Sequence, residues 1–215
     1  VMERSLLSKA VELSKLKIKR SSEANCALIN NNKEKVLLVL QVPQDVNMRS
    51  HSPFFRSHAD IVEAVYNAIP DETSLLIREH PLYAGKYEKE LYEFAALNSI
   101  SFDRGKSLSE SITESVCVVV NNSTVGLETM VLGVPLVVLG NSYYDNNKFV
   151  YKYTGNSLDE IISQAIKEPI DTKLVKERIN YFYNDCFIKG HFRDLEPKRF
   201  LGVSDFLARK LDKAK

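Results

Sequence analysis

The chain has 215 residues, of which 44% are hydrophobic and 27% are charged, a composition typical of globular proteins. Its 29 Lys and Arg residues nearly balance its 28 Asp and Glu residues, which excludes a nucleic-acid binder built on bulk charge. No apolar run approaches the about 20 residues that span a bilayer, and the first residues lack the apolar core of a signal peptide, so we expect neither. Three cysteines show no metal-binding spacing and, being odd in number, argue against a disulfide framework. Cys117 lies within an apolar run and is predicted to be a core residue.

The first twenty residues show helical periodicity and end in a basic cluster, Lys15, Lys17, Lys19 and Arg20. Such a helix either lies on an anionic lipid surface, as a peripheral membrane contact, or packs as a linker helix. We expect residues 1–34 to form this helix and a polar connector. Residues 35–195 then form the main domain, and residues 196–215 a C-terminal helix.

Beyond the connector, apolar runs alternate with amphipathic segments. The apolar runs predict strands at 36–41, 74–79, 100–102, 116–120 and 135–140. The amphipathic segments predict helices at 59–69, 86–97, 107–115, 124–133, 157–168, 171–183 and 203–214. Five strand–helix steps with short connections predict an α/β fold, a doubly wound open parallel sheet of Rossmann-like type. Ligands bind such sheets at the carboxyl ends of the strands, so the loops directly after strands are the candidates for a site.

The segment NNSTVGLE follows the strand 116–120 and begins a helix. Its hydroxyls and first backbone amides form a natural anion site, and Gly126 allows close approach of a ligand or a neighbouring strand. Glu128 lies four residues after Thr124 and five after Ser123, whereas a capping box needs a spacing of three. Glu128 is therefore available to bind ribose hydroxyls. The alternative is a plain helix N-cap without a ligand.

The pair His80-Pro81 directly follows the strand 74–79. Proline restricts the residue before it to extended backbone, which would hold the imidazole in place to donate to a phosphate. A solvated loop histidine is the alternative. His51 and His58 do not complete a metal-binding set with His80, and no pair of aspartates follows a strand as a magnesium site would require.

A third loop, Gln41-Val-Pro-Gln-Asp45 with Arg49 behind it, follows the first predicted strand. A carboxylate at this place can act as nucleophile, base or electrostatic stabiliser. The planar guanidinium of Arg49 can hold a substrate carboxylate. The alternative is an Asx turn with a surface arginine.

These motifs occur in a specific order: Q-x-x-x-D, then HP, then N-S-T-x-G-x-E, then GVPLVVLG. Neither G-x-G-x-x-G nor G-x-x-x-x-G-K-[ST] is present, which argues against dehydrogenases and P-loop nucleotidases. From about Lys35 to Asp194 the chain resembles the capsule polysaccharide biosynthesis and export family, whose characterised members include retaining β-Kdo transferases. The segments HSPF (51–54) and GNSYYD (140–145) belong to the resemblance. KGHF (189–192) departs from it, because such proteins tend to carry Gly-Ser-Phe there.

The resemblance implies a GT-B glycosyltransferase, and the motifs look like those of its C-terminal, nucleotide-binding domain. It implies contacts with the CMP phosphate from His80, Asn122, Ser123 and Thr124. Glu128 would hold the ribose, and Asp45 matches the catalytic nucleophile of retaining members, with Gln41 in support. A contact from Arg49 to the donor carboxylate is our own inference. The leaving phosphate would gain charge beside a histidine and a helix N-terminus, so no metal or other cofactor is expected.

The expected function is therefore transfer of a 2-keto sugar acid from CMP-Kdo to a lipid or glycan acceptor, in the cytoplasm at the inner face of the membrane. One alternative is a teichoic-acid-type enzyme that uses CDP-glycerol, although NNSTVGLE favours the sugar acid over the Asp-Tyr-Ser-Ser pattern of that family. Another is a non-catalytic scaffold of a capsule assembly complex. The presence of Asp45, His80 and Glu128 together argues against it, because a scaffold would be expected to have lost one of them. Since a GT-B enzyme has two such domains, we expect half an enzyme that lacks its N-terminal acceptor domain and binds donor with little or no transfer.

Overall fold

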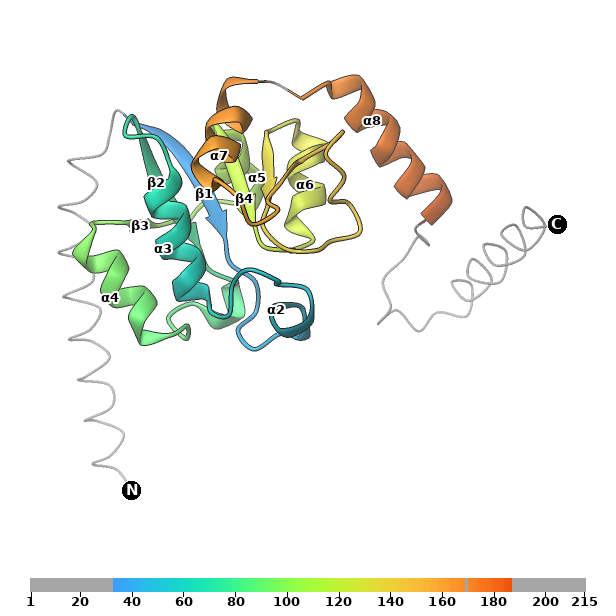
Figure 1. Ribbon diagram of the computed structural model, residues 1–215. Helices are drawn as coiled ribbons and strands as arrows, with labels where there is room; N and C mark the ends of the chain where they lie inside the picture. The colour runs from blue at the N-terminus through green and yellow to red at the C-terminus, as the bar shows by residue number, and fades with distance from the viewer. Residues whose placement is uncertain (1–32, 169, 187–215) are drawn as a thin grey trace. The chain divides into compact units, whose positions relative to one another are not determined.

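The computed structural model describes residues 33–168 and 170–186 (Figure 1). The chain divides into two compact units, Val1–Asp171 and Thr172–Lys215, and each is described by itself. The predicted helices at 1–20 and 203–214 and the KGHF segment lie outside the described residues. The predicted domain boundaries at 34/35 and 195/196 stay predictions.

The first unit is built on a six-stranded sheet in which every strand pair is parallel, in the order β3-β2-β1-β4-β5-β6. The strands are β1 (Glu34–Val39), β2 (Thr73–Arg78), β3 (Ser101–Phe102), β4 (Cys117–Val120), β5 (Leu136–Val138) and β6 (Tyr151–Lys152). This order confirms the predicted doubly wound open sheet. The prediction of five strands was wrong, because β6 is a two-residue strand and is too short to form a hydrophobic pattern.

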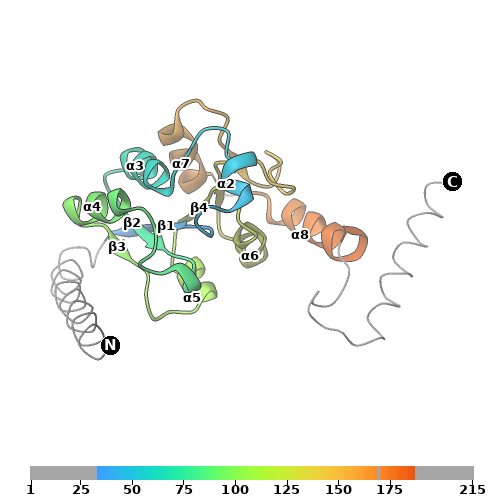
Figure 2. The ribbon, with the colours of Figure 1, turned by 90° about the horizontal axis from the view of Figure 1, so that it is seen from below.

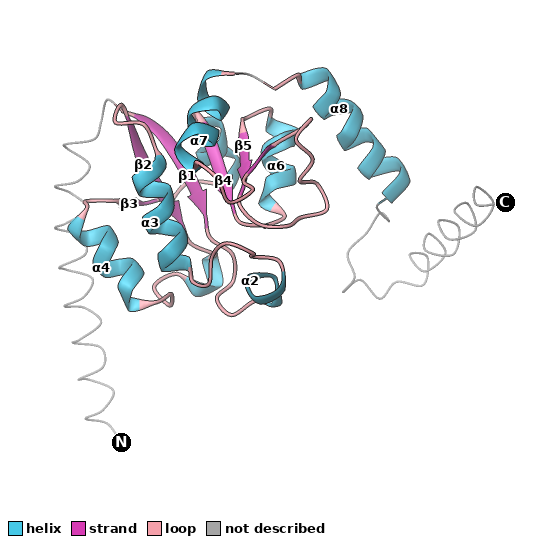
Figure 3. Ribbon diagram, in the orientation of Figure 1, coloured by secondary structure: helices cyan, strands magenta, loops and turns pink. Residues whose placement is uncertain are grey.

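Helices cover both faces of the sheet (Figure 2). On one face α3 packs against both α4 and α7, and on the other α5 packs against α6. Two short helical segments, α2 and the 3₁₀ turn η1, lie in the loops after β1 and β2 (Figure 3). The bounds are α2 (Val46–Ser50), α3 (His58–Ala68), η1 (Pro81–Tyr83), α4 (Lys89–Leu97), α5 (Leu108–Thr113), α6 (Val125–Leu132) and α7 (Leu158–Lys167). The sequence did not predict α2 or η1, which are too short to show helical periodicity.

Local capping fixes where the longer helices begin and end. Capping boxes begin α3 at Ser57 and α5 at Ser107, and Gly133 ends α6 in the left-handed conformation (φ 73°), as its predicted glycine stop requires. In the second unit the helix predicted at 171–183 is α8 (Thr172–Tyr181) followed by a π-helical turn, Phe182–Cys186.

The core of the first unit lies on both sides of the two central strands. Val36, Leu37 and Leu38 of β1 and all four residues of β4 are completely buried, as expected for parallel strands covered by helices. Cys117 belongs to this core, which confirms its predicted role. Burial raises the pKa of its thiol to about 12, so the side chain is an inert apolar residue at physiological pH.

Candidate functional site

The strand order has a switch point between β1 and β4, where successive strands begin to add to the other side of the sheet. From β1 the chain builds β2 and β3 on one side, then crosses back and builds β4, β5 and β6 on the other. The loops after β1 and β4 therefore lead away from each other and leave a crevice between them, where ligands bind in sheets of this type. A cavity of about 340 Å³ lies at this point. It is lined by Val39, Leu40, Gln41, Val42, Asp45, Asn47, Arg78, Glu79, His80, Pro81, Leu108, Asn122, Ser123, Thr124 and Val125.

The loop after β1 brings Asp45 to the wall of the cavity. Gln44 just before it has the left-handed conformation (φ 62°), which is uncommon outside glycine and turns the chain sharply into α2. Asp45 is the N-cap of α2, and its Oδ1 accepts a hydrogen bond from the backbone amide of Asn47 at 3.1 Å. The Asx-type arrangement weighed as an alternative is thus present, and it holds the half-buried carboxylate in a fixed place on the cavity wall.

Gln41, in the same loop as Asp45 and two residues past the end of β1, is buried. Within the part of the chain that the structure describes, neither polar atom of its side-chain amide has a hydrogen-bond partner. Its place on the cavity wall agrees with the predicted location, while its supporting role stays a prediction.

The loop after β2 presents His80. Its backbone is extended (φ −63°, ψ 131°), as predicted for a residue before proline. The ring Nδ1 accepts a hydrogen bond from the Leu82 amide at 3.3 Å. The neutral ring therefore carries its proton on Nε2, which can donate to an anion in the cavity. The imidazole is held by the turn that it caps rather than being a mobile loop side chain.

The loop after β4 contributes two hydroxyl groups. Thr124 is the N-cap residue of α6, yet its side chain makes no capping hydrogen bond, so this is not a plain side-chain N-cap. The Oγ of Ser123 accepts a hydrogen bond from the amide of Val125 at 3.3 Å, which leaves its own hydrogen available for donation. Both residues line the cavity at the amino end of the helix, where the helix dipole favours negative charge.

Asn122 lies beside them, but its side chain has a different task. Its amide Nδ2 donates to the backbone oxygens of Asn47 at 3.2 Å and of His51 at 3.0 Å. Both amide hydrogens thus tie the α2 loop to the end of β4. A bond from this side chain to a phosphate, as the resemblance implies, would require one of these two to break.

Gly126 does allow a close approach, but the group that approaches is a side chain of the protein. A Cβ atom at this position would lie 2.6 Å from two ring carbons of Tyr144, which is buried and whose hydroxyl donates to the carbonyl of Ser123. Gly126 is not among the cavity-lining residues, so its predicted place in the substrate site is not observed. Its absent side chain makes room for the loop after β5.

Two further predicted residues lie apart from the cavity. Glu128 is exposed on α6, consistent with its predicted freedom from a capping box, but it does not line the cavity. Arg49 is exposed on α2 and lines a separate cavity of about 530 Å³, together with Gln44 and Met48 on the other side of that helix. Their predicted contacts with ribose and with a donor carboxylate stay predictions.

Some of the charged residues that line the cavity have ion-pair partners and others do not. Arg78 is paired with Asp103 and also donates to Ser111 Oγ at 2.9 Å, and Glu79 accepts from Arg104 at 3.1 Å. Among the lining residues, this leaves the carboxylate of Asp45 and the imidazole of His80 without an ion-pair partner. A carboxylate and an imidazole thus face the cavity from neighbouring strand ends.

The sequence analysis missed two residues that build this site, Glu79 and Tyr87. The buried Glu79 accepts hydrogen bonds through Oε1 from the Gly85 amide at 2.7 Å and from the Tyr92 hydroxyl at 2.6 Å. The Tyr87 hydroxyl contacts the backbone of both Gln41 and His80. Neither gave a recognisable signal, because Glu79 falls within the predicted strand and Tyr87 within a predicted helix.

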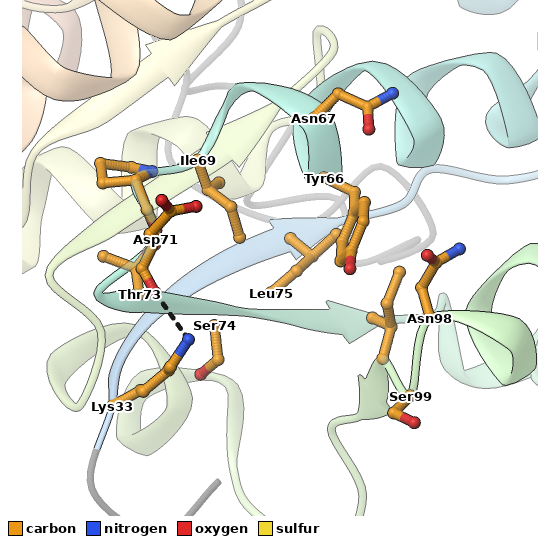
Figure 4. Close-up of a pocket in the computed structure, with 12 residues that line it drawn as sticks. Lys33, Tyr66, Asn67, Ile69, Asp71, Thr73, Ser74, Leu75, Asn98 and Ser99 are labelled. Atoms are coloured by element: carbon orange, nitrogen blue, oxygen red, sulfur yellow. Dashed lines mark hydrogen bonds between the residues drawn. The ribbon is translucent and has the colours of Figure 1, made fainter.

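Another cavity of about 340 Å³ lies at the opposite edge of the sheet, where β1 and β2 begin (Figure 4). Its lysine, Lys33, donates to the backbone oxygen of Asp71 at 2.6 Å, as the dashed line in Figure 4 marks. The loops at this edge were predicted to be plain turns, and several side chains there, Lys33 among them, bond to neighbouring backbone carbonyls. We therefore place the candidate site at the carboxyl edge.

In the described residues, no three His, Cys, Asp or Glu side chains gather as a metal site would require. Over the same ranges, none of the helices has the length and apolar character needed to cross a membrane.

Fold and site together define an α/β protein with a Rossmann-like parallel sheet, whose cavity of carboxylate, imidazole and hydroxyl groups lies at the switch point of the strand order. The chain belongs to the family described as capsule polysaccharide biosynthesis protein, whose model matches residues 5–193. This confirms the family that the order of motifs indicated.

Two curated relatives are similar over parts of the chain. Protein FixF of Sinorhizobium fredii is 27% identical over 164 residues, which cover 74% of this chain and 39% of FixF. The capsule polysaccharide export protein KpsS of Escherichia coli is 30% identical over 125 residues, which cover 54% of this chain and 32% of KpsS. The matched part of the chain thus spans between about a third and two fifths of each relative's length.

Among solved structures, KpsC of Thermosulfurimonas dismutans, described as a beta Kdo 2,7 transferase, matches with a TM-score of 0.48 and 19% identity. The match covers 69% of this chain and 54% of that one. The wall teichoic acid polymerase TagF matches with a TM-score of 0.41 and 15% identity, over 89% of this chain and 48% of that one.

Proposed function

We propose that this chain is the nucleotide-sugar-binding domain of a capsule polysaccharide glycosyltransferase, and that its donor is a CMP-linked 2-keto sugar acid such as CMP-Kdo. The observation that supports this most is the one cavity that Asp45, His80, Ser123 and Thr124 line together at the switch point. Membership of the capsule polysaccharide biosynthesis family supplies the biological setting.

The proposed binding mode uses the available donors of the cavity. The donor phosphate lies between His80 Nε2 on the β2 side and the hydroxyls of Ser123 and Thr124 on the β4 side. The amino end of α6 adds its dipole. Hydrogen bonds to an ionised group contribute about 1.5–3 kcal/mol each, so two or three of them supply a large part of the free energy that binds a nucleotide. Glu128 would bind the ribose, and Arg49 the donor carboxylate, where each can reach the bound nucleotide.

The proposed transfer step begins when the bond between the anomeric carbon and the phosphate oxygen breaks. The electron pair leaves with the phosphate, whose growing charge His80 and the α6 N-terminus stabilise without a metal ion. The anomeric carbon becomes oxocarbenium-like, and the carboxylate of Asp45 stabilises or captures it. The acceptor hydroxyl then attacks the anomeric carbon and passes its proton to the released phosphate or to solvent. If Asp45 has captured this carbon, the attack breaks the bond to its carboxylate and the configuration is retained.

The acceptor in this proposal is a lipid or glycan that a second domain would hold, and the reaction takes place at the cytoplasmic face of the membrane. Two alternatives remain to be tested against it: a CDP-glycerol phosphotransferase domain and a non-catalytic scaffold. The sequence NNSTVGLE favours the sugar acid over CDP-glycerol. Asp45 and His80 on one cavity argue against a scaffold, which has no use for paired reactive groups.

A nucleotide panel titrated against the chain by calorimetry tests the donor assignment. We expect CMP to bind measurably and UDP and GDP to bind much more weakly. Equal affinity for CMP and UDP would contradict a CMP-linked donor. Tighter binding of CDP-glycerol than of CMP-Kdo would support the phosphotransferase, and no binding of any nucleotide would support the scaffold.

Asp45→Asn tests the catalytic role in the full-length protein as its gene encodes it. Asparagine caps helices as well as aspartate does, so the fold and the CMP affinity should stay unchanged while sugar transfer falls to background. Asp45→Ala is the matched control, because it also removes the cap and should lower the free energy of unfolding by about 0.5–2 kcal/mol. Transfer at the wild-type rate by Asp45→Asn would exclude Asp45 as nucleophile.

A further inference from the structure

The ends of β1 and β2 are joined across the candidate site by one side chain, Tyr87. The regular ladder between these strands ends where the Leu40 amide donates to the Arg78 carbonyl at 2.9 Å. Beyond this bond, the Tyr87 hydroxyl accepts from the His80 amide at 3.0 Å and donates to the Gln41 carbonyl at 3.0 Å. The hydroxyl thus bridges two backbone groups whose chains are diverging into separate loops.

The bridge is rigid because Tyr87 is fixed on every side. Its side chain is buried, and its ring packs edge to face against His58 with centroids 5.0 Å apart. Its backbone amide donates to the Tyr92 hydroxyl at 3.1 Å, and that hydroxyl donates to Glu79 at 2.6 Å. Burial raises the pKa of Tyr87 to about 12, so the hydroxyl remains protonated and continues to donate to Gln41 at physiological pH.

We propose that Tyr87 is the positioning residue of the site: its hydroxyl sets the distance between the Gln41–Asp45 loop and His80, and thereby the width of the cavity that receives the donor phosphate. Tyr87 is not one of the cavity-lining residues, so it acts through the backbone of the residues that are. The effect on nucleotide affinity rests on the proposed function. The effect on the geometry of the free protein does not.

Tyr87→Phe keeps the ring against His58 and removes the bridge, which leaves the Gln41 carbonyl and the His80 amide without their shared partner. We expect the CMP affinity to fall about 5- to 30-fold, because the two loops that form the phosphate site are no longer held together. The matched control is Tyr151→Phe on β6, which also removes a tyrosine hydroxyl that donates to a backbone carbonyl, that of Glu168, and does not touch the bridge or the cavity. It should change CMP affinity less than twofold.

NMR of the free protein supplies a readout that a general loss of stability does not produce. In Tyr87→Phe the ring resonances of His80 should shift and its amide should exchange faster with solvent, while both stay unchanged in Tyr151→Phe. Unchanged His80 resonances in a folded Tyr87→Phe variant would overturn the positioning role. Failure of the wild-type chain to bind any nucleotide would instead count against the proposed function alone.

If Tyr87→Phe does not fold, hydrogen exchange in the wild-type chain still decides the matter. The His80 amide should then be protected far more strongly than the amide of the exposed loop residue Asn147, which donates no hydrogen bond within the described residues. Equal exchange rates at the two amides would mean that the bridge does not persist in solution and would overturn the proposal.

Discussion

Two cavities of the same volume, about 340 Å³, lie at opposite edges of the sheet and differ in what their polar side chains do. At the amino edge several of these groups already bond to nearby carbonyls, as Lys33 does to Asp71, Thr73 to Pro70 and Asn98 to Phe94. At the carboxyl edge His80 Nε2 and the hydroxyls of Ser123 and Thr124 keep donors available. Cavity size therefore does not mark the site in this protein, whereas the switch point of the strand order does, with its imidazole and two hydroxyls at the amino end of α6.

Replacement of His80 should cause the largest loss of CMP affinity at the carboxyl-edge cavity. His80→Ala removes the Nε2 donor, and a hydrogen bond to an ionised phosphate contributes about 1.5–3 kcal/mol, so CMP affinity should fall about 10- to 100-fold. Calorimetric titration measures the change. The control is His51→Ala, because the His51 side chain is exposed and only its backbone oxygen makes the bonds that hold Asn122 and Asn141. An equal loss of affinity in both variants would contradict a specific role for His80.

The members of the site that the sequence predicted are those that depend only on topology. Carboxyl ends of parallel strands meet at one edge, so residues directly after strands, such as Asp45, His80 and Ser123, had to come together once the sheet was recognised. The direction of each side chain depends on loop conformation instead. The Asn122 amide bonds to residues 75 and 71 positions away, and nothing in its own segment indicates that choice.

Gly126→Ala should damage the fold at the carboxyl edge without removing any donor. The added methyl group would lie 2.6 Å from ring carbons of Tyr144, and this ring cannot retreat, because it is buried and its hydroxyl is bonded to Ser123. Overpacking of this kind lowers the free energy of unfolding by about 1–3 kcal/mol, which denaturant titration can measure. In the double variant Gly126→Ala/Tyr144→Ser the loss of stability should be smaller than the sum of the losses in the two single variants. Strict additivity would show that the ring is not the obstacle.

Gly126 also marks the limit of inference from the fold pattern. A glycine in the first turn of a helix after a strand indicates a close approach, and that part of the prediction is confirmed. The identity of the approaching group was not predictable, because Tyr144 lies in a loop after a different strand and reaches Gly126 only once β4 and β5 are paired.

Removal of single hydroxyls should distinguish the two cavities through smaller losses of CMP affinity. Thr124→Val and Ser123→Ala each remove one of two neighbouring hydroxyls from the carboxyl-edge cavity. Because the other hydroxyl still binds the phosphate, CMP affinity should fall only about two- to tenfold, less than the full about 1.5–3 kcal/mol of a bond to an ionised group. Ser74→Ala at the amino edge removes a hydroxyl that donates to the Glu34 carbonyl, so it should leave the affinity unchanged. A loss of CMP affinity in Ser74→Ala would place the nucleotide at the wrong edge for our proposal.

The smallest expected effects concern two residues with left-handed backbone. Gln44 (φ 62°) precedes Asp45 at the carboxyl edge, and Ser99 (φ 54°) lines the amino-edge cavity. The left-handed conformation costs a residue with a Cβ about 1–2 kcal/mol, while glycine loses about 0.5–1 kcal/mol more conformational entropy on folding. Gln44→Gly and Ser99→Gly should therefore each raise the free energy of unfolding slightly, by about 0.5 kcal/mol.

The two glycine variants should differ in the mobility of the candidate site. Gln44 forms a left-handed turn, and this turn leads directly into α2, where the Asn47 amide donates to Asp45. Glycine at 44 admits other conformations, so the Asn47 amide should exchange faster with solvent in Gln44→Gly and at the wild-type rate in Ser99→Gly. Identical exchange in both variants would mean that α2 holds Asp45 without help from the turn. If Ser99→Gly relieves strain without any gain in mobility, the left-handed turn at Ser99 is only a turn. If Gln44→Gly relieves strain but makes the Asp45 loop more mobile, the strained turn at Gln44 serves to position the Asp45 carboxylate.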